Sequence, residues 1–360
     1  MEQSLFLEEV KKFFPGIAAR VIDRLNDTSV KKAVTYLHRT MLRKEFSTNL
    51  KWESITVNGY SVAADVIAMD SSLPLKKRDS IARANGDIPK IGMEMALREK
   101  ELTELDILAT QPGQAQELLR KLFRDTERVI TGQLETLEYM FLLGLSTGVT
   151  VIADANNVGT GIRIDFGYPA GNKFNVATVW SNTASTPLTD LAAVQAKATA
   201  DGNVITKWML DRATFNNMAK TTQVKEMYAA STNFFGATVP IPTLSQVNTA
   251  AKDRYGFEFE IIERSVNFEK NGVRTALKPW AVGAVVGLTT DQVGTLTWGR
   301  LAEMNHPVDN VNYTTVNDFI LVSKFRLNRP SLSEHTTSQS LVLPVISGVD
   351  AIYLVDSLTV

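Results

Sequence analysis

The stretch QAQELLRKLFRDTERVITGQLETLEYMFLLGLSTG, residues 114–148, decides the architecture that the sequence predicts. Its apolar residues recur every three or four positions, which is the spacing of one face of an α-helix: Leu118, Leu119, Leu122, Val129, Ile130, Leu134, Leu137, Met140 and Phe141. Pro112 and Gly113 precede the helix, and Gly148 suits its end. At about 1.5 Å per residue this helix, about 114–147, is roughly 50 Å long, the diameter of a compact globule of this length. The sequence therefore predicts a flat or elongated subunit with this helix as its spine.

Two stretches upstream are expected to be long strands, NLKWESITVNGYSVAADVIAM (49–69) and KIGMEMALR (90–98). The first is rich in β-branched and aromatic residues, and the second alternates apolar and polar positions. The polar segment between them carries four cations, Lys76, Lys77, Arg78 and Arg83. We expect this segment to be the exposed tip of an extended hairpin, and a disordered surface loop is the alternative.

The remaining chain falls into three parts. Residues 1–45 contain helical patches that Pro15 and Gly16 interrupt, and resemble an arm more than a core. From Pro187 the pattern changes to mixed helices and strands, and we place a second lobe at about 188–310. The tail returns to strands, so this lobe is inserted between the spine and the tail.

The composition excludes several classes of protein. The chain has 360 residues, 44% of them hydrophobic, and no cysteine, which rules out disulfides, thiolate metal sites and cysteine nucleophiles. The formal net charge of -1 provides no basic field for gripping nucleic acid. No window is long and apolar enough for a membrane span, and the N-terminus lacks the apolar core of a secretion signal. We therefore expect a soluble, cytoplasmic protein.

GLSTG, residues 144–148, matches the G-x-S-x-G motif of serine hydrolases and makes Ser146 a candidate nucleophile. That motif requires a strand, a sharp turn and then a helix. Here the helix comes first, and the negative end of its dipole disfavours an oxyanion at Ser146. Gly148 is better explained by helix termination, and Gly144 by close packing.

The sequence gives little support for a metal or cofactor site. DANNVG, which starts at Asp154, begins like a calcium loop but continues without the required ligands, so a tight turn is favoured. His38, His306 and His335 lie far apart in sequence, although His335 could titrate near neutrality. No phosphate-binding glycine motif is complete, and we expect no cofactor and no metal.

What remains is a long helix, a hairpin with a basic tip and an N-terminal arm. Such projections leave apolar faces that one chain cannot bury, so partners should complete them. The sequence therefore predicts a self-assembling protein.

Three stretches resemble the lambda-type major capsid proteins of tailed bacteriophages, which share the Hong Kong 97 capsid fold. The first, DTERVITGQLETLEYMFLLGLSTGVTVI (125–152), is similar to the spine helix of that family and the strand after it. The second combines IDFGYP (164–169), VATVWSN (176–182) and TPLTDL (186–191), and the third is HTTSQSLVLPVISGVDAIYLV (335–355). The resemblance covers most of the chain from about residue 46.

The resemblance implies an α+β fold with named parts. These are an N-terminal arm (1–45), an extended loop (46–108), a peripheral domain (109–187 and 311–360) and an axial domain (188–310). It further implies pentamers and hexamers of an icosahedral or prolate head that encloses double-stranded DNA and assembles in the host bacterial cytoplasm. Scaffold, portal and decoration proteins are the implied partners, with no membrane and no enzymatic activity.

Two hypotheses concern contacts between subunits. Lys76, Lys77, Arg78 and Arg83 would meet acidic residues of a neighbour, with Glu117, Asp125 and Glu127 on its spine as acceptors. Trp52, Ile55, Val62 and Val66 would pack between subunits, so that Trp52→Ala weakens shells more than the fold of the isolated subunit. Two alternatives to a phage capsid remain: an encapsulin-type nanocompartment with an enzyme cargo, and a serine hydrolase using Ser146.

Overall fold

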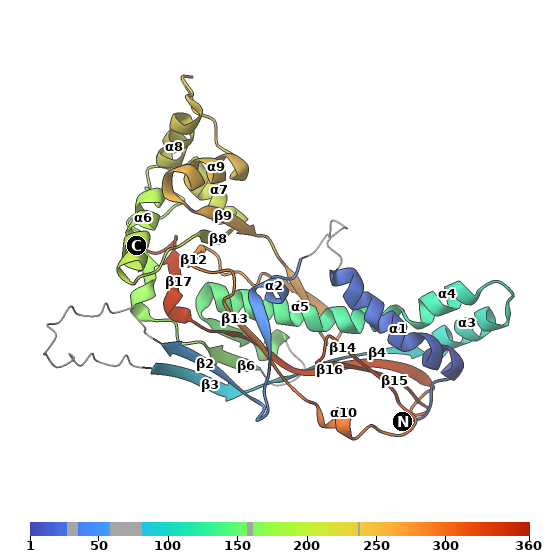
Figure 1. Cartoon of the computed structure of the whole chain (residues 1–360). Helices are drawn as coiled ribbons and strands as arrows, with labels where there is room; N and C mark the ends of the chain where they lie inside the picture. The colour runs from blue at the N-terminus through green and yellow to red at the C-terminus, as the bar shows by residue number, and fades with distance from the viewer. Residues whose placement is uncertain (27–34, 58–80, 157–160, 237) are drawn as a thin grey trace, which may run out of the picture.

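A computed structural model describes residues 1–26, 35–57, 81–156, 161–236 and 238–360, without the side chains of residues 55–57, 81–83 and 156. The chain forms an elongated body with a second lobe standing on one end (Figure 1). Runs of helices and runs of strands follow one another along the chain, so the fold is α+β, as the resemblance implied. Within the described residues, no helix combines the length and apolar composition needed to cross a bilayer.

The spine is two helices where the sequence predicted one. Helix α4 covers Ala115–Leu122 and α5 covers Arg124–Thr147, with Phe123 between them in a non-helical turn. At about 1.5 Å per residue α5 is roughly 36 Å long, shorter than predicted. The C-terminal end agrees with the prediction, because Gly148 ends the helix in the left-handed region with φ 80°.

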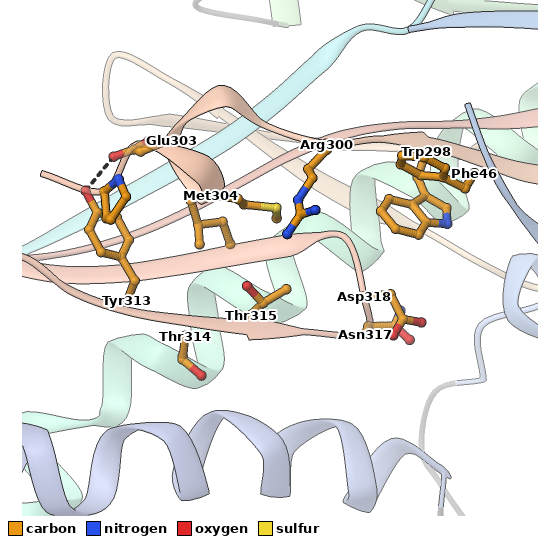
Figure 2. Close-up of a pocket in the computed structure, with 12 residues that line it drawn as sticks. Phe46, Trp298, Arg300, Glu303, Met304, Tyr313, Thr314, Thr315, Asn317 and Asp318 are labelled. Carbon is orange, nitrogen blue, oxygen red and sulfur yellow. Dashed lines mark hydrogen bonds between the residues drawn. The ribbon is translucent and has the colours of Figure 1, made fainter. Parts of the chain in front are cut away.

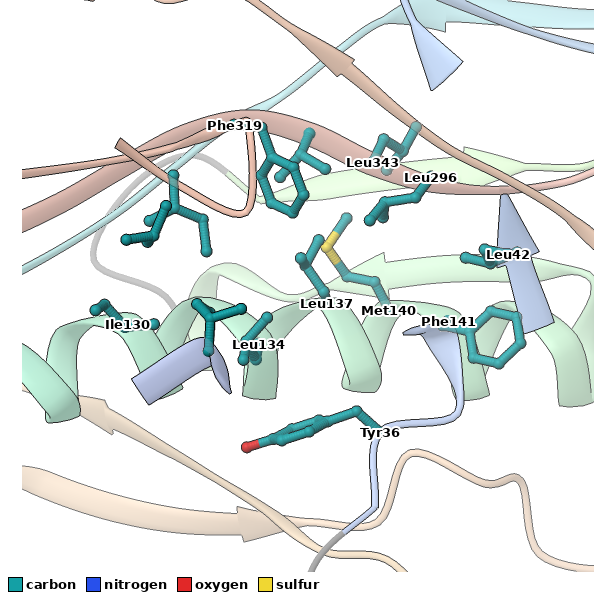
Figure 3. Packing of buried hydrophobic residues seen from close by; sticks show 14 of the residues in the cluster. Tyr36, Leu42, Ile130, Leu134, Leu137, Met140, Phe141, Leu296, Phe319 and Leu343 are labelled. Carbon is teal, nitrogen blue, oxygen red and sulfur yellow. The ribbon is translucent and has the colours of Figure 1, made fainter. Parts of the chain in front are cut away.

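A six-stranded sheet packs along one side of α5. Its path runs β1-β13-β16-β15-β14, and β4 pairs with the remaining edge of β16. The bounds are β1 Leu42–Phe46, β4 Lys90–Arg98, β13 Gly294–Gly299, β14 Asn312–Val316, β15 Ile320–Leu327 and β16 Ser333–Ile346. Leu137 and Met140 of α5 point toward Leu296 and Leu343 of the sheet, while Tyr36 lies across the helix from them (Figure 3).

Close packing of α5 depends on a small residue near its end. A Cβ atom on Gly144 would lie 2.7 Å from both Phe166 and the Thr150 hydroxyl. The hydroxyl of Thr150 also donates to the carbonyl of Met140 at 2.7 Å. Thr150 lies in the short β5–β6 pair that follows the spine, β5 Val149–Ile152 and β6 Ile162–Asp165. The prediction that Gly144 permits close packing is confirmed.

The second lobe has its own sheet and its own hydrophobic core. The sheet order is β7-β17-β12-β8-β9, with β7 Lys173–Asn175, β8 Lys207–Asp211, β9 Glu258–Ile262, β12 Ala284–Leu288 and β17 Ile352–Asp356. Its helices are α6 Pro187–Ala200, α7 Arg212–Lys220, α8 Thr222–Thr232 and α9 Leu244–Tyr255. Strand β17 comes from the chain's tail, whereas β13 of the range 188–310 lies in the six-stranded sheet. The five-stranded sheet therefore takes two strands, β7 and β17, from outside the expected lobe boundaries, and the six-stranded sheet takes β13 from within them.

The hairpin is built differently from the prediction. Strand β2 (Lys51–Val57) pairs with β3 (Ile81–Asp87), a segment that the sequence analysis assigned to the polar tip. The expected partner, KIGMEMALR, forms β4 and pairs with β16 instead. The alternation of β4 indicated a strand correctly but could not identify its neighbour.

The N-terminal segment forms a helix that packs against the body. Helix α1 runs unbroken through Pro15 and Gly16 from Leu7 to Asn26, so the predicted interruption is wrong. It buries Val10, Phe14 and Ala18 against the body, where Phe14 stacks on Phe123 at 6.3 Å between ring centroids. The other elements are α2 His38–Met41, α3 Glu99–Thr110, β10 Val266–Lys270, β11 Val273–Leu277 and α10 Ala302–Asn305.

Candidate intersubunit surface

Trp52 fixes the base of the β2–β3 hairpin to the chain's own core. It is directly opposite Gly86 in the hairpin register, and a Cβ on Gly86 would lie 2.9 Å from the indole Nε1. The ring meets Phe166 edge to face at 5.9 Å, and only 4% of Trp52 is exposed. Its ring therefore offers a neighbouring subunit very little surface.

The other residues proposed for the loop contact lie mostly beyond the described residues. Lys76, Lys77 and Arg78 fall there, as do Val62 and Val66. Arg83 and Ile55 face each other in the register of β2 and β3, and their side chains are not described. The structure thus places the strands that lead to the basic segment without placing its charges.

The three acids proposed as acceptors each have a partner in their own chain. Glu117 accepts two bonds from Arg120, at 2.6 and 2.8 Å, and Glu127 pairs with Arg24 of α1. Asp125 lies 3.7 Å from Arg128 with 9% of its side chain exposed. The side chains of Glu117 and Glu127 retain 35% and 50% exposure, so these two remain within reach of a neighbour and Asp125 does not.

Ser146 has no catalytic environment. It is 1% exposed, its hydroxyl donates to the carbonyl of Leu143 at 3.3 Å, and it accepts the N–H of Ala281 at 3.1 Å. A nucleophilic serine needs a base within hydrogen-bond reach, and both of these partners are backbone groups. Ser146 connects the end of the spine to the segment before β12.

The three histidines lie in separate surroundings and do not form one cluster. Buried His38 bonds Glu138, His335 bonds Glu94 through Nδ1 and Ser333 through Nε2, and His306 follows α10. Asp154 accepts the N–H of Gly161 at 2.6 Å through its side chain. Among the described residues, no three histidine or acidic side chains are grouped as metal ligands.

The break in the spine lies over a buried lysine that the sequence analysis missed. The Lys324 ammonium donates to the Leu122 carbonyl at 3.3 Å and to the Thr336 hydroxyl at 3.0 Å, and lies 5.9 Å from the centre of the Phe123 ring. Glu334 is 4.0 Å away, and both side chains are fully buried. Burial lowers the pKa of Lys324, which Glu334 and Asp125 oppose. Burial likewise raises the pKa of Asp125.

A surface pocket of about 870 Å³ opens beside the six-stranded sheet (Figure 2). Phe46 and Trp298 form one wall, with ring centroids 4.7 Å apart, and Arg300 projects beside Met304. Of its two acids, Glu303 accepts the Tyr313 hydroxyl at 2.9 Å and Asp318 pairs with Lys44 at 2.6 Å. Aromatic surface with a guanidinium and an engaged acid suits contact with another chain better than general acid-base chemistry.

Large apolar side chains are also exposed on the second lobe. Phe235 is 94% exposed in the segment between α8 and α9, Ile241 is 54% exposed there, and Val282 is 71% exposed before β12. Singly exposed apolar residues are normal on protein surfaces, so these three do not by themselves mark a contact surface.

Residues 35–355 match the family described as phage major capsid protein E. The chain belongs to this family. A protein described as a prophage capsid protein, from Escherichia coli CFT073, has a similar structure, with a TM-score of 0.56 and 12% identity over 94% of this chain and 97% of that one. A phage-related protein of Bordetella bronchiseptica RB50 gives a TM-score of 0.52 and 11% identity over 95% and 96%. A search of curated proteins gave no sequence match.

Membership of the phage major capsid protein E family explains the architecture. The fold is Hong Kong 97-like, as the resemblance implied, and the protein is a phage major capsid protein of the virion shell. Its role is structural. Neither the nanocompartment nor the serine hydrolase is favoured by the family match, and the surroundings of Ser146 agree.

Proposed function

We propose that copies of this chain assemble into the pentamers and hexamers of an icosahedral or prolate head that encloses double-stranded DNA. The observation that carries this proposal is the family match over residues 35–355. The formal charge of -1 supports it, because a container that held DNA tightly through phosphate contacts would hinder packaging and release. Many weak contacts repeated by symmetry suffice to stabilise such a shell.

We propose the same division of the chain as the sequence suggested, with 1–45 as arm, 46–108 as extended loop, 109–187 and 311–360 as peripheral domain and 188–310 as axial domain. The separate hydrophobic cores support two domains. The exchange of β13 and β17 between the sheets ties the domains together and argues for a rigid junction. Within 46–108, the β2–β3 hairpin is the part free to project, since β4 is held by β16.

The basic segment of the extended loop is proposed to meet acids of a neighbouring subunit. Lys76, Lys77, Arg78 and Arg83 would then replace the present partners of Glu117 and Glu127. Those partners lie on the surface, where ion pairs contribute little to stability. Reversing all four loop charges should lower shell yield and shell stability. Unchanged yield and stability would contradict this contact.

The proposed partners beyond the chain itself are scaffold, portal and decoration proteins, with assembly in the cytoplasm of the bacterial host. The chain is proposed to have no enzymatic activity, no cofactor and no membrane contact. The surroundings of Ser146, which are two backbone groups, support the absence of hydrolase chemistry.

Electron microscopy of the protein expressed together with its neighbouring genes tests this function. Closed shells whose interior holds double-stranded DNA are the expected result. Shells that instead retain an enzyme cargo would indicate a nanocompartment, and the absence of rings and shells would contradict the proposal.

A further inference from the structure

A groove of about 770 Å³ lies between α1 and the junction of α4 and α5. Apolar side chains from both sides line it, namely Phe13, Ile17, Leu119 and Phe123. Phe13, Ile17 and Leu119 are half-buried, so the chain itself covers their faces incompletely. The groove is thus an unfilled apolar surface along the contact between the N-terminal helix and the spine.

The rim of the groove is basic on a chain that is close to neutral. Its charged side chains are the cations Lys12, Arg20, Arg120 and Arg124 and the acid Glu127. Glu127 is paired with Arg24, and Arg120 with Glu117. Lys12, Arg20 and Arg124 form no ion pair within the described part of the chain. The groove therefore suits an apolar segment that carries acidic groups.

Helix α3 presents such a segment. Its inner positions, Leu102 and Leu105, are buried, whereas Ile107 on its outer face is 53% exposed. Ile107 lies about a quarter turn round the helix from Glu99 and Asp106, which share one face because they are seven residues apart, about two helical turns. Both are exposed and neither forms an ion pair among the described residues. Two acids without an ion pair among the described residues thus lie to one side of an exposed isoleucine, whose own face also carries exposed Lys100, seven residues before it.

Helix α3 cannot fill the groove of its own chain. It packs beside α4 at the end of the molecule where α1 also lies (Figure 1). Leu118 and Leu122 of α4 are buried, while Leu119 and Arg120 belong to the groove on another face of the same helix. The acidic face of α3 and the basic groove of the same chain are therefore available to two different neighbouring subunits.

We propose that α3 of one subunit docks into the groove between α1 and α4–α5 of the next copy of this chain. Ile107 meets the apolar floor, and Glu99 and Asp106 meet the rim cations Arg20 and Arg124. The contact is head to tail, so repetition closes a ring when the rotation between copies permits. This inference rests on the proposed self-assembly and names one surface through which it proceeds. The apolar floor favours a protein segment over the phosphates of nucleic acid.

Charge reversal with rescue tests the contact in the full-length protein. The variant Glu99→Lys/Asp106→Lys and the variant Arg20→Glu/Arg124→Glu should each lower the yield of rings or shells roughly tenfold, the effect of losing about 1.4 kcal/mol. The chain that carries all four substitutions restores opposite charges and should recover most of the yield. Asp309→Lys provides the matched control for Asp106→Lys, because Asp309 is an exposed acid elsewhere with no ion pair in the described structure.

The outcomes separate this inference from the function on which it rests. Wild-type protein that forms no rings or shells contradicts the proposed self-assembly and the inference with it. Wild-type shells together with unaffected variants overturn the inference alone. The inference alone is also overturned if only the groove variant is impaired, or if the four-fold variant shows no recovery. A groove variant that assembles normally but retains less DNA overturns it as well. Thermal unfolding of each isolated variant separates lost assembly from lost folding.

Discussion

Nδ1 of His38 lies 2.6 Å from Oε2 of Glu138, and both side chains are fully buried. The same carboxylate accepts the backbone N–H groups of Leu37 at 2.9 Å and His38 at 3.1 Å. Glu138 lies in the middle of α5, whereas Leu37 and His38 begin α2, so one side chain satisfies the orphan amides at that helix start. The spine thereby holds the segment that leads from the N-terminal arm into β1.

Glu138→Ala should therefore destabilise the isolated subunit strongly. The substitution leaves His38 and two amides buried without their acceptor, a loss of about 3–5 kcal/mol. Urea denaturation of the subunit measures it. Glu127→Ala, which removes an exposed pair on the same helix, is the control and should cost about 1 kcal/mol or less. Similar losses for the two variants would contradict the role of Glu138.

Trp52→Ala should destabilise the fold of the single subunit by about 3–5 kcal/mol. This revises the expectation that shells would suffer more than the subunit, because the ring is buried in its own chain. Gly86→Ala should cost about 1–3 kcal/mol by forcing a Cβ against the indole. Gly171→Ala is a control, since a Cβ there meets nothing within 4 Å. A Trp52→Ala subunit of unchanged stability would restore the intersubunit interpretation.

Lys324 should make stability depend on pH in the alkaline range. Its pKa is lowered in the folded chain from 10.5, so between the folded and unfolded values the unfolded chain binds more protons and stability rises with pH. Replacing both partners, in Lys324→Met/Glu334→Gln, should remove this slope. Measuring the free energy of unfolding of the wild type and the variant from neutral pH up to 10.5 tests this difference in pH dependence. If the stability of the wild type rose no more steeply with pH than that of the variant, or fell with pH, the lowered pKa of Lys324 would be contradicted.

Ser146→Ala should cost about 1–3 kcal/mol in stability, because the N–H of Ala281 loses its buried acceptor. A fluorophosphonate probe should label neither the wild-type protein nor the variant. Labelling that depends on Ser146 would contradict the absence of a base in its surroundings and reopen the hydrolase alternative.

The spine shows how much of the structure hydrophobic periodicity can predict. The apolar repeat predicted one helix through Leu122 and on to Phe141. It could not predict the break at Phe123, because the helical spacing of apolar residues continues across the break. The break coincides with Lys324, some 200 residues later in the chain, whose ammonium bonds the last carbonyl of α4. Nothing in the sequence around Lys324 distinguishes a buried lysine from one at the surface of a strand, so its burial could not be foreseen.

The hairpin shows a second limit. The alternation of Ile91, Met93, Met95 and Leu97 identifies a strand with two faces but carries no information about pairing. IARANGD contains Asn85 and Gly86, which favour a turn, yet Gly86 is required in the strand to admit the Trp52 ring. Tertiary packing thus overrode the local turn signal. For the same reason the groove beside α1 was missed, since Phe13 and Leu119 meet only in the folded chain.

Sedimentation velocity combined with negative-stain microscopy of the purified full-length chain tests whether this capsid protein assembles with itself. We predict rings with five or six times the 39.7 kDa mass of the chain, or closed shells built from them. A monomer that persists under every condition of salt, pH and concentration, and in the presence of its neighbouring gene products, would contradict the account.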